Sequence, residues 1–270
     1  MTRMKAAAYT IAILPGLSMI FDLMSGQLGM IPLQSLVYWS GLWATALLIL
    51  TFAISPLSQT LHWPHLIDGR RILGVSGLIY SLVHLICYAL LRKWDLAGIG
   101  LEILRRPTLL IASLSLLGLM FLGLTSHDLM MKKLGSANWH RLHRLNGMLT
   151  ALALLHFLMS PGSFSAQFLL SGSLFWILGW RILNKWNWHL QLTPLLILAS
   201  LAGLFTGAFE IIWQKFHKNI PVEEVWSDLF DFTEGPSSIW IIWAIGLLLA
   251  LLTFILNSKL KPMENHTHGA

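Results

Sequence analysis

The stretch WHRLHRLNGMLTALALLHFLM, residues 139–159, contains a long apolar run with His143 near its start and His156 near its end. A second run, SLVHLICY, residues 81–88, has His84 at its centre. Both runs belong to segments that are long and apolar enough to lie in a lipid bilayer, where an imidazole is costly unless it binds something. His84, His143 and His156 are therefore the first candidates for functional residues.

The composition of the whole chain favours a membrane protein. Of its 270 residues, 56% are hydrophobic and 11% are charged, and the mean hydropathy is +0.68. These values are too apolar for a soluble domain. The single cysteine, Cys87, excludes an internal disulfide and an iron-sulfur cluster held by four thiolates. We therefore expect an all-α fold, a polytopic membrane helix bundle with the lipid bilayer as its surroundings.

Apolar runs bounded by charged residues, Pro or Gly predict about eight transmembrane helices. The first run follows a basic segment but has no small-residue cleavage site, so we expect a retained helix and not a cleaved signal. The turn SPGSFS splits a long charge-free run into two helices. The predicted spans cover residues 6–23, 36–55, 71–91, 107–126, 142–160, 165–183, 192–214 and 237–257.

Basic residues in the loops set the predicted orientation. With the N-terminus inside, the cytoplasmic side receives roughly twice as many Lys and Arg residues as the outside, which places both termini in the cytoplasm. This topology explains the net charge of +6, and we expect no nucleic-acid partner. The external loop 92–106 is unusually basic and either binds an acidic group or holds lipid phosphates. The acidic external loop 218–238 is expected to form a short interfacial helix or a docking surface.

This orientation brings two histidines to similar depth in the membrane. The third span runs outward, and His84 lies 13 residues after Arg71, in the outer half of the bilayer. The fifth span runs the same way, and His156 lies near its outer end. Two neutral imidazoles across a bundle interior are what a six-coordinate b-type haem requires, and such ligation favours electron transfer. The alternative is two histidines that are hydrogen-bonded to backbone carbonyls.

His143 is less easily placed by geometry. It precedes His156 by 13 residues, which is about 20 Å along a helix and suits a second haem near the opposite leaflet. The same 13 residues turn a straight helix by about 220°, so the two side chains share a face only if a π-bulge corrects the phase. Otherwise His143 has a different role at the start of the helix. Its counterparts on the third span, Arg70 and Arg71, cannot ligate iron but can pair with haem propionates. A second haem would need a ligand from outside this helix, such as His62, His65, His127 or His140, or an open site.

Six motifs occur in order along the first two thirds of the chain: LPGLSMIFDLMSGQLGMIPLQSL, SGLWATALLILTFAISPL, GRRILGVSGLIYSLVHLICY, RRPTLL, LTSHDLMMKKLGSANWHRLHRL and ALLHFL. Together they resemble the haem-binding membrane subunit of the periplasmic protein-methionine-sulfoxide reductase, within the ferric reductase-like transmembrane domain group. The resemblance covers roughly residues 10–180. The family's cofactor-binding residues map onto His84, His143, His156, Arg70, Arg71 and Trp139.

The resemblance implies a multi-pass cytochrome b in the bacterial inner membrane. Such a subunit takes electrons from quinol or from a separate flavin reductase and delivers them to a periplasmic molybdopterin reductase. It implies haem b, one expected and a second left open, with FMN or a quinone as a further cofactor. We expect a ferric reductase-like domain over residues 1–185 and an extension over residues 186–270, with two further spans and the acidic loop. Asn146 and Gly147 replace residues that are usually apolar or aromatic in the family.

Two alternatives remain open from the sequence. A stand-alone quinol-dependent ferric reductase would need the same haem but no protein acceptor. A transporter or a membrane scaffold would use the histidines as a proton relay, although no internal repeat with paired broken helices supports a transporter. A haem spectrum in the purified protein would separate the cytochrome from the transporter.

Overall fold

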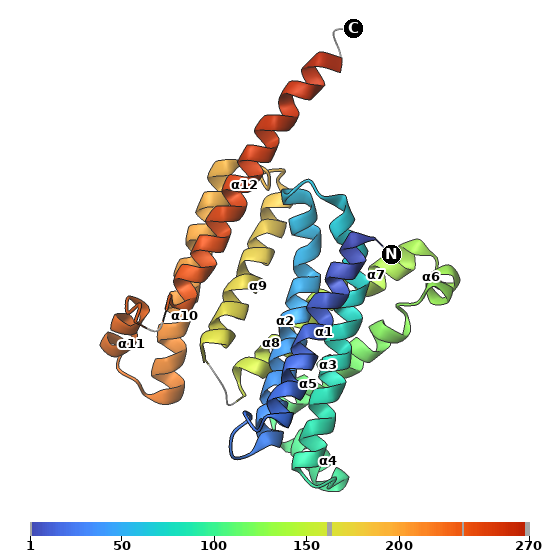
Figure 1. Ribbon diagram of the computed structural model, residues 1–270, viewed down its shortest axis with the longest axis vertical. Helices are drawn as coiled ribbons and strands as arrows, with labels where there is room; N and C mark the ends of the chain where they lie inside the picture. The colour runs from blue at the N-terminus through green and yellow to red at the C-terminus, as the bar shows by residue number, and fades with distance from the viewer. Residues whose placement is uncertain (1, 161–163, 234, 268–270) are drawn as a thin grey trace. The chain divides into compact units, whose positions relative to one another are not determined.

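The computed structural model describes residues 2–160, 164–233 and 235–267, and the side chains up to residue 258 except that of Phe164. Within these ranges the regular structure is helical and no strand is present, which confirms the all-α fold class (Figure 1). The elements are α1 (Arg3–Met24), α2 (Pro32–Thr60), the 3-10 helix η1 (Pro64–Gly69), α3 (Arg70–Leu91), α4 (Leu96–Arg105), α5 (Pro107–Leu124), α6 (Asp128–Leu134), α7 (Ser136–His143), α8 (Leu145–Leu158), α9 (Phe164–Lys185), α10 (Leu192–Lys218), α11 (Val222–Leu229) and α12 (Ser238–Thr267).

Among the described residues, seven segments are long and apolar enough to cross a membrane: α1, α2, α3 with η1, α5, α9, α10 and α12. They match seven of the predicted spans, and the chain is a multi-pass membrane protein. The remaining predicted span corresponds to α8. Its 14 residues extend about 21 Å, which is shorter than the hydrocarbon core of roughly 30 Å. The cytoplasmic placement of both termini stays a prediction.

The predicted span over residues 142–160 is interrupted near its start. α7 ends at His143 and α8 begins at Leu145. In α8, Gly147 packs against α2, where a Cβ atom would lie 2.8 Å from the ring of Phe52. His143 and His156 therefore lie on two helices that meet at Arg144 and not on the one continuous helix that the sequence predicted. The turn SPGSFS lies between α8 and α9, and its residues 161–163 fall outside the described part of the chain.

The helices pack as two compact units, which we describe separately. The first unit contains residues 1–54 and 65–162, and the second contains residues 55–64 and 163–270. The sequence-based boundary at residue 185, between a haem-binding domain and an extension, stays a prediction.

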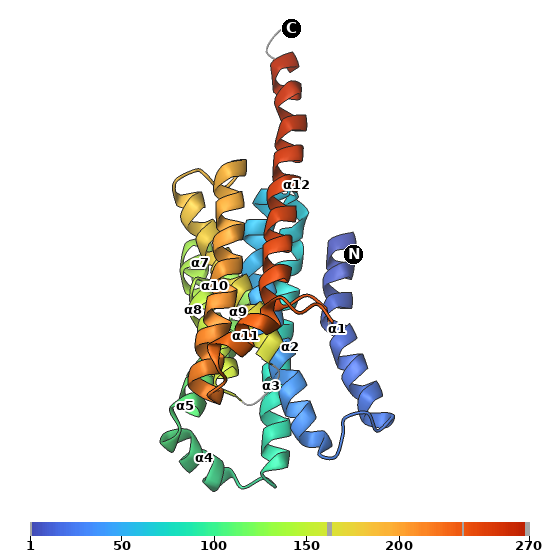
Figure 2. The same ribbon diagram turned by 90° about the vertical axis from the view of Figure 1, so that its left-hand side faces the viewer.

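The first unit is built from α1, most of α2, α3 and the helices up to α8. α3 packs against α1 and α5, and α5 packs against α8 (Figures 1 and 2). The hydroxyl of Tyr80 in α3 donates to the carbonyl of Ala12 in α1 over 2.9 Å. Ser115 of α5 donates to the carbonyl of Leu149 in α8, also over 2.9 Å, and Gly118 leaves room for the Leu149 side chain. Small residues and hydrogen bonds of this kind hold helices together in lipid, where the hydrophobic effect does not.

The second unit is a three-helix bundle of α9, α10 and α12, with the short helix α11 against α10. Gly246 of α12 lies so close to α10 that a Cβ atom would be 2.7 Å from the Cβ of Ala199. α11 lies in the acidic loop and buries Val225 and Leu229. A helix in this loop is thus present, and its location at a membrane interface stays a prediction.

Candidate functional site

The first unit contains a cavity of about 840 Å³ that is bordered by α2, α3, α4, α5 and α8. Its wall is mainly aliphatic and aromatic, and two of the sequence-predicted residues line it: His84 from α3 and His156 from α8. Cavities of roughly 300–1,000 Å³ are typical of sites for organic ligands and cofactors. The cavity is therefore the candidate functional site of this unit.

The imidazole rings of His84 and His156 lie next to each other in the cavity. Their centroids are 6.2 Å apart and their planes make an angle of 78°. Two imidazoles on opposite sides of one metal ion have centroids about 6 Å apart, because each metal–nitrogen bond is about 2 Å and each ring adds about 1 Å. The separation of the two rings thus fits a shared metal centre.

Backbone carbonyls hold both rings by the nitrogen that is nearer to the main chain. Nδ1 of His84 lies 2.7 Å from the carbonyl oxygen of Val37, and Nδ1 of His156 lies 3.1 Å from that of Thr108. A carbonyl only accepts hydrogen bonds, so each Nδ1 carries the proton and each Nε2 keeps its lone pair. In this tautomer Nε2 is the nitrogen that can ligate a metal. The sequence also allowed two histidines that only form hydrogen bonds to backbone carbonyls. Such bonds account for one of the two nitrogens in each ring.

Gly41 of α2 provides the space that His84 occupies. A Cβ atom at this position would lie 2.9 Å from Nδ1 and 3.1 Å from Cε1 of His84. A side chain there would push the ring away from the carbonyl of Val37, which is on the same helix as Gly41. The glycine is therefore part of the support that orients the imidazole.

The described part of the cavity contains two imidazoles and not a full set of protein ligands for a metal ion. In the ranges that the structure describes, no group of three or more His, Cys, Asp or Glu side chains could hold a metal ion. A haem supplies four ligands from its own ring and needs only axial groups from the protein. Two imidazoles in the metal-binding tautomer, in an apolar cavity, fit that requirement.

His143 and Trp139 form a separate cluster. Their rings stack with centroids 4.0 Å apart and planes inclined by 24°. Nε2 of His143 lies 3.3 Å from the hydroxyl of Thr125, and Nε1 of Trp139 donates to the carbonyl of the same threonine over 2.8 Å. Thr125 follows the last residue of α5, so this cluster is fixed at the end of that helix.

The two predicted arginines belong to the cluster of His143. They begin α3, and Arg71 precedes His84 by 13 residues, or about 20 Å of helix. Burial, and then the positive charge of Arg70, lower the pKa of His143, which ends the short helix α7. Arg71 forms an exposed ion pair with Asp128 at 2.6 Å. The structure thus divides the predicted residues into a histidine pair in the cavity and a second group around His143.

The histidines considered as a second ligand lie in different places. His140 packs edge-on against Trp139, with ring centroids 5.2 Å apart. His127 caps α6, where its Nδ1 accepts from the backbone amide of Met130. His62 belongs to the second unit, in which its Nε2 contacts the amide oxygen of Asn257. His65 is an exposed residue of η1.

Sequence reasoning missed a polar group that borders the cavity. Glu102 of α4 accepts a hydrogen bond from the hydroxyl of Tyr88 over 2.7 Å and pairs with Arg92 at 3.1 Å and Arg106 at 3.0 Å. The hydrogen bond from Tyr88, aided by the charges of Arg106 and Arg92, holds the pKa of Glu102 below its usual value. Tyr88 and Arg106 both line the cavity. The spacing of Glu102 and Arg106, four residues apart on a helix, was the signal available in the sequence.

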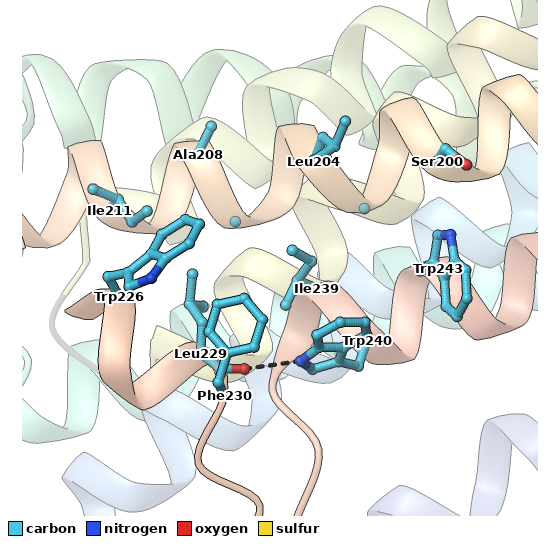
Figure 3. Close-up of a pocket in the computed structure, with 12 residues that line it drawn as sticks. Ser200, Leu204, Ala208, Ile211, Trp226, Leu229, Phe230, Ile239, Trp240 and Trp243 are labelled. Carbon is cyan, nitrogen blue, oxygen red and sulfur yellow. Dashed lines mark hydrogen bonds between the residues drawn. The ribbon is translucent and has the colours of Figure 1, made fainter. Parts of the chain in front are cut away.

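The second unit has a cavity of a different kind, about 420 Å³ in volume and bordered by α10, α11 and α12 (Figure 3). Aromatic residues form much of its wall: Trp226, Phe230, Trp240 and Trp243. The indole nitrogen of Trp240 donates to the carbonyl of Leu229 over 2.9 Å. The hydroxyl of Ser200, which also lines this cavity, donates to its own helix. No lining residue has a side chain that commonly ligates a metal, so the histidine cavity is the better candidate site.

Comparison with known proteins gives a family match and several similar proteins. Residues 40–155 match the family described as "ferric reductase like transmembrane component", a range that runs from α2 into α8. Three relatives are each named protein-methionine-sulfoxide reductase heme-binding subunit MsrQ. The one from Polaromonas naphthalenivorans is 31% identical over 67% of this chain and 85% of its own length. The chain belongs to the MsrQ family.

Two further MsrQ proteins show similar coverage. The relative from Pectobacterium carotovorum is 34% identical over 62% of this chain and 84% of its own length, and that from Azospira oryzae is 29% identical over 72% and 86%. No solved structure matches this chain. The MsrQ relatives leave about a third of the chain unmatched, and the ferric reductase match ends before α9, the first long helix of the second unit.

Proposed function

We propose that this protein is a b-type cytochrome, the haem-binding membrane subunit of an electron-transfer system. The observation that supports it is the pair His84 and His156, with ring centroids 6.2 Å apart in an apolar cavity and with both Nδ1 atoms on backbone carbonyls. Membership of the MsrQ family, whose relatives are named heme-binding subunits, supports it independently.

In this proposal the chain binds and orients the cofactor. The carbonyls of Val37 and Thr108 fix the tautomer of the two histidines, so that each Nε2 would be able to bind the iron of a haem. The mainly aliphatic and aromatic wall would give a bound haem an apolar environment. A bound haem supplies one-electron redox chemistry, and two axial imidazoles favour electron transfer over oxygen binding.

We assign the entry of electrons to the cluster around His143. Its other members are Trp139, Arg70 and Arg71. The cluster lies about 20 Å of helix away from the histidine pair and combines an aromatic stack with two cations at the start of α3. Such a group can bind an anionic or aromatic donor, such as a quinol head group or a flavin. A second haem, for which His143 would be a ligand, is the other use that the family resemblance allows.

The test of haem binding is the absorption spectrum of purified protein. Wild-type protein is expected to show a reducible b-type spectrum with low-spin character, because both axial positions are occupied. Single His84→Ala and His156→Ala variants should lose this low-spin spectrum. His217→Ala is the matched control, because His217 lies in the second unit, stacked on Trp213. An unaltered spectrum in the His84→Ala, His156→Ala double variant would refute the proposal.

The partners proposed for the subunit follow from its family. We place it in the bacterial inner membrane, with the quinol pool or a flavin reductase as donor and a periplasmic molybdopterin methionine sulfoxide reductase as acceptor. The reduced subunit should be reoxidised when that reductase and a methionine sulfoxide substrate are added. Reoxidation by ferric iron, with no response to the reductase, would instead favour a stand-alone ferric reductase.

A further inference from the structure

Arg106 is the one side chain with a permanent charge among the described residues that line the histidine cavity. It directly precedes α5, two residues before Thr108, whose carbonyl holds His156. The remainder of the wall is apolar or carries neutral polar groups. A permanent cation is thus placed on the border of a cavity that is otherwise without charge.

The charge of Arg106 is only partly neutralised by its neighbours. Its guanidinium pairs with Glu102, whose side chain is 12% exposed and also holds Arg92 and the hydroxyl of Tyr88. Two arginines share one carboxylate, so the group carries a net charge of about +1, which favours an additional anion. The side chain of Arg106 is 65% exposed, and therefore part of its guanidinium remains accessible.

We propose that Arg106 binds a propionate carboxylate of the haem held by His84 and His156, and that Glu102 offsets part of its positive charge. The inference rests on the proposed haem site. A haem carries two carboxylates on one edge, and a carboxylate at an apolar cavity is costly unless a cation or a donor meets it. The guanidinium fork matches a carboxylate in shape and charge.

This assignment also resolves what the basic loop 92–106 binds. The sequence left two options, an acidic group or lipid phosphates. Arg106 borders the same cavity as the two histidines, whereas the adjacent Arg105 is exposed and does not line it. The position of Arg106 therefore favours a carboxylate that belongs to the occupant of the cavity.

The reduction potential of the haem reports this contact with a defined sign. Reduction adds a negative charge to the cofactor, and a nearby cation stabilises the reduced form. Arg106→Gln should therefore lower the midpoint potential, and Glu102→Gln, which makes the same group more positive, should raise it. A purely structural role would not predict opposite signs, because either substitution would disturb the same network.

The experiment is a redox titration of the purified holoprotein, followed at the haem absorption band. Arg106→Gln should lower the equilibrium constant for reduction on the order of tenfold, which is about 59 mV for a one-electron couple. Arg105→Gln, which removes the same charge one residue earlier, should leave the potential close to that of the wild type. Arg106→Lys should lie between wild type and Arg106→Gln, because the charge stays and the fork is lost. Equal shifts for Arg105→Gln and Arg106→Gln, or shifts of the same sign for Glu102→Gln and Arg106→Gln, would overturn the inference.

Two controls keep this result separate from other causes. The low-spin spectrum should persist in all four variants, so a wild-type potential in Arg106→Gln would refute the propionate contact and leave the histidine ligation intact. The titration is repeated in detergent with and without added anionic phospholipid. The effect of Arg106→Gln should be the same in both, and an effect that requires the lipid would assign Arg106 to a lipid phosphate and overturn the inference.

Discussion

The cavities of the two units differ in the hydrogen bonds made by the polar side chains of their walls. In the first unit, His84 and His156 each form a hydrogen bond from Nδ1 to a backbone carbonyl, which leaves Nε2 for a ligand. Arg106 adds a positive charge to the wall of the cavity. In the second unit, Trp240 and Ser200 both donate to carbonyls of their own unit. A polar atom in a membrane protein is costly unless it is paired. Because the described wall of the second cavity also offers no imidazole, the comparison favours the first cavity as the ligand site, and we interpret the second as a packing surface.

The largest effect is expected where the support of His84 is removed. Gly41→Val places a branched side chain where a Cβ atom alone would be 2.9 Å from Nδ1 of His84. The ring should leave the carbonyl of Val37, so Nε2 no longer faces the cavity in a fixed tautomer. We expect the haem-to-protein ratio, measured by absorbance of the purified protein, to fall severalfold.

The control for this substitution is Gly100→Val. Gly100 is also helical, but a Cβ atom there meets nothing within 4 Å. The intrinsic cost of valine in a helix is similar at the two positions. If Gly41→Val bound as much haem as Gly100→Val, the cavity would not depend on the orientation of His84, and the contrast with the second unit would lose its main support.

A smaller effect is expected at the cluster of His143, which lies in the first unit but outside its cavity. His143→Ala removes the ring that stacks on Trp139 and contacts Thr125, while His84 and His156 keep their carbonyl partners. We expect the low-spin haem spectrum to persist and the rate of reduction by a quinol analogue to fall severalfold. Stopped-flow absorbance measures both. A loss of half the haem per protein would show instead that His143 ligates a second haem.

The sequence was sufficient to predict most of the helices because lipid restricts the conformations of the backbone. A chain in a bilayer must satisfy its own hydrogen bonds, so apolar runs are expected to become helices, and the seven long helices lie where the runs predicted them. The cost of an imidazole in lipid also singled out His84 and His156 before any contact was known. The similar depth predicted for them allowed the two rings to meet, and their centroids lie 6.2 Å apart.

What the sequence could not provide depends on contacts between distant segments. The break near Arg144 lies in a stretch without proline, and the space at Gly147 is set by Phe52, which is far away in the chain. The hydrogen-bond partners of the two histidines are main-chain carbonyls. Every residue has such a carbonyl, so the sequence does not show which one is the partner. Arg106 was visible as part of a basic loop, but its position on the cavity border depends on how α4 and α5 pack.

The smallest effect on haem is expected in the second unit. Trp240 contacts the rings of Phe230, Phe232 and Trp243. Its indole nitrogen donates a hydrogen bond to the carbonyl of Leu229 (Figure 3). Trp240→Ala should destabilise this unit by about 2 kcal/mol, roughly half the cost of truncating a fully buried tryptophan. Thermal unfolding in detergent should begin at a lower temperature than in Trp186→Ala, a control at an exposed tryptophan of the same unit. The haem spectrum and midpoint potential should match the wild type in both variants. A shifted potential in Trp240→Ala alone would mean that the aromatic cavity influences the redox centre, and the division between a ligand cavity and a packing surface would have to be abandoned.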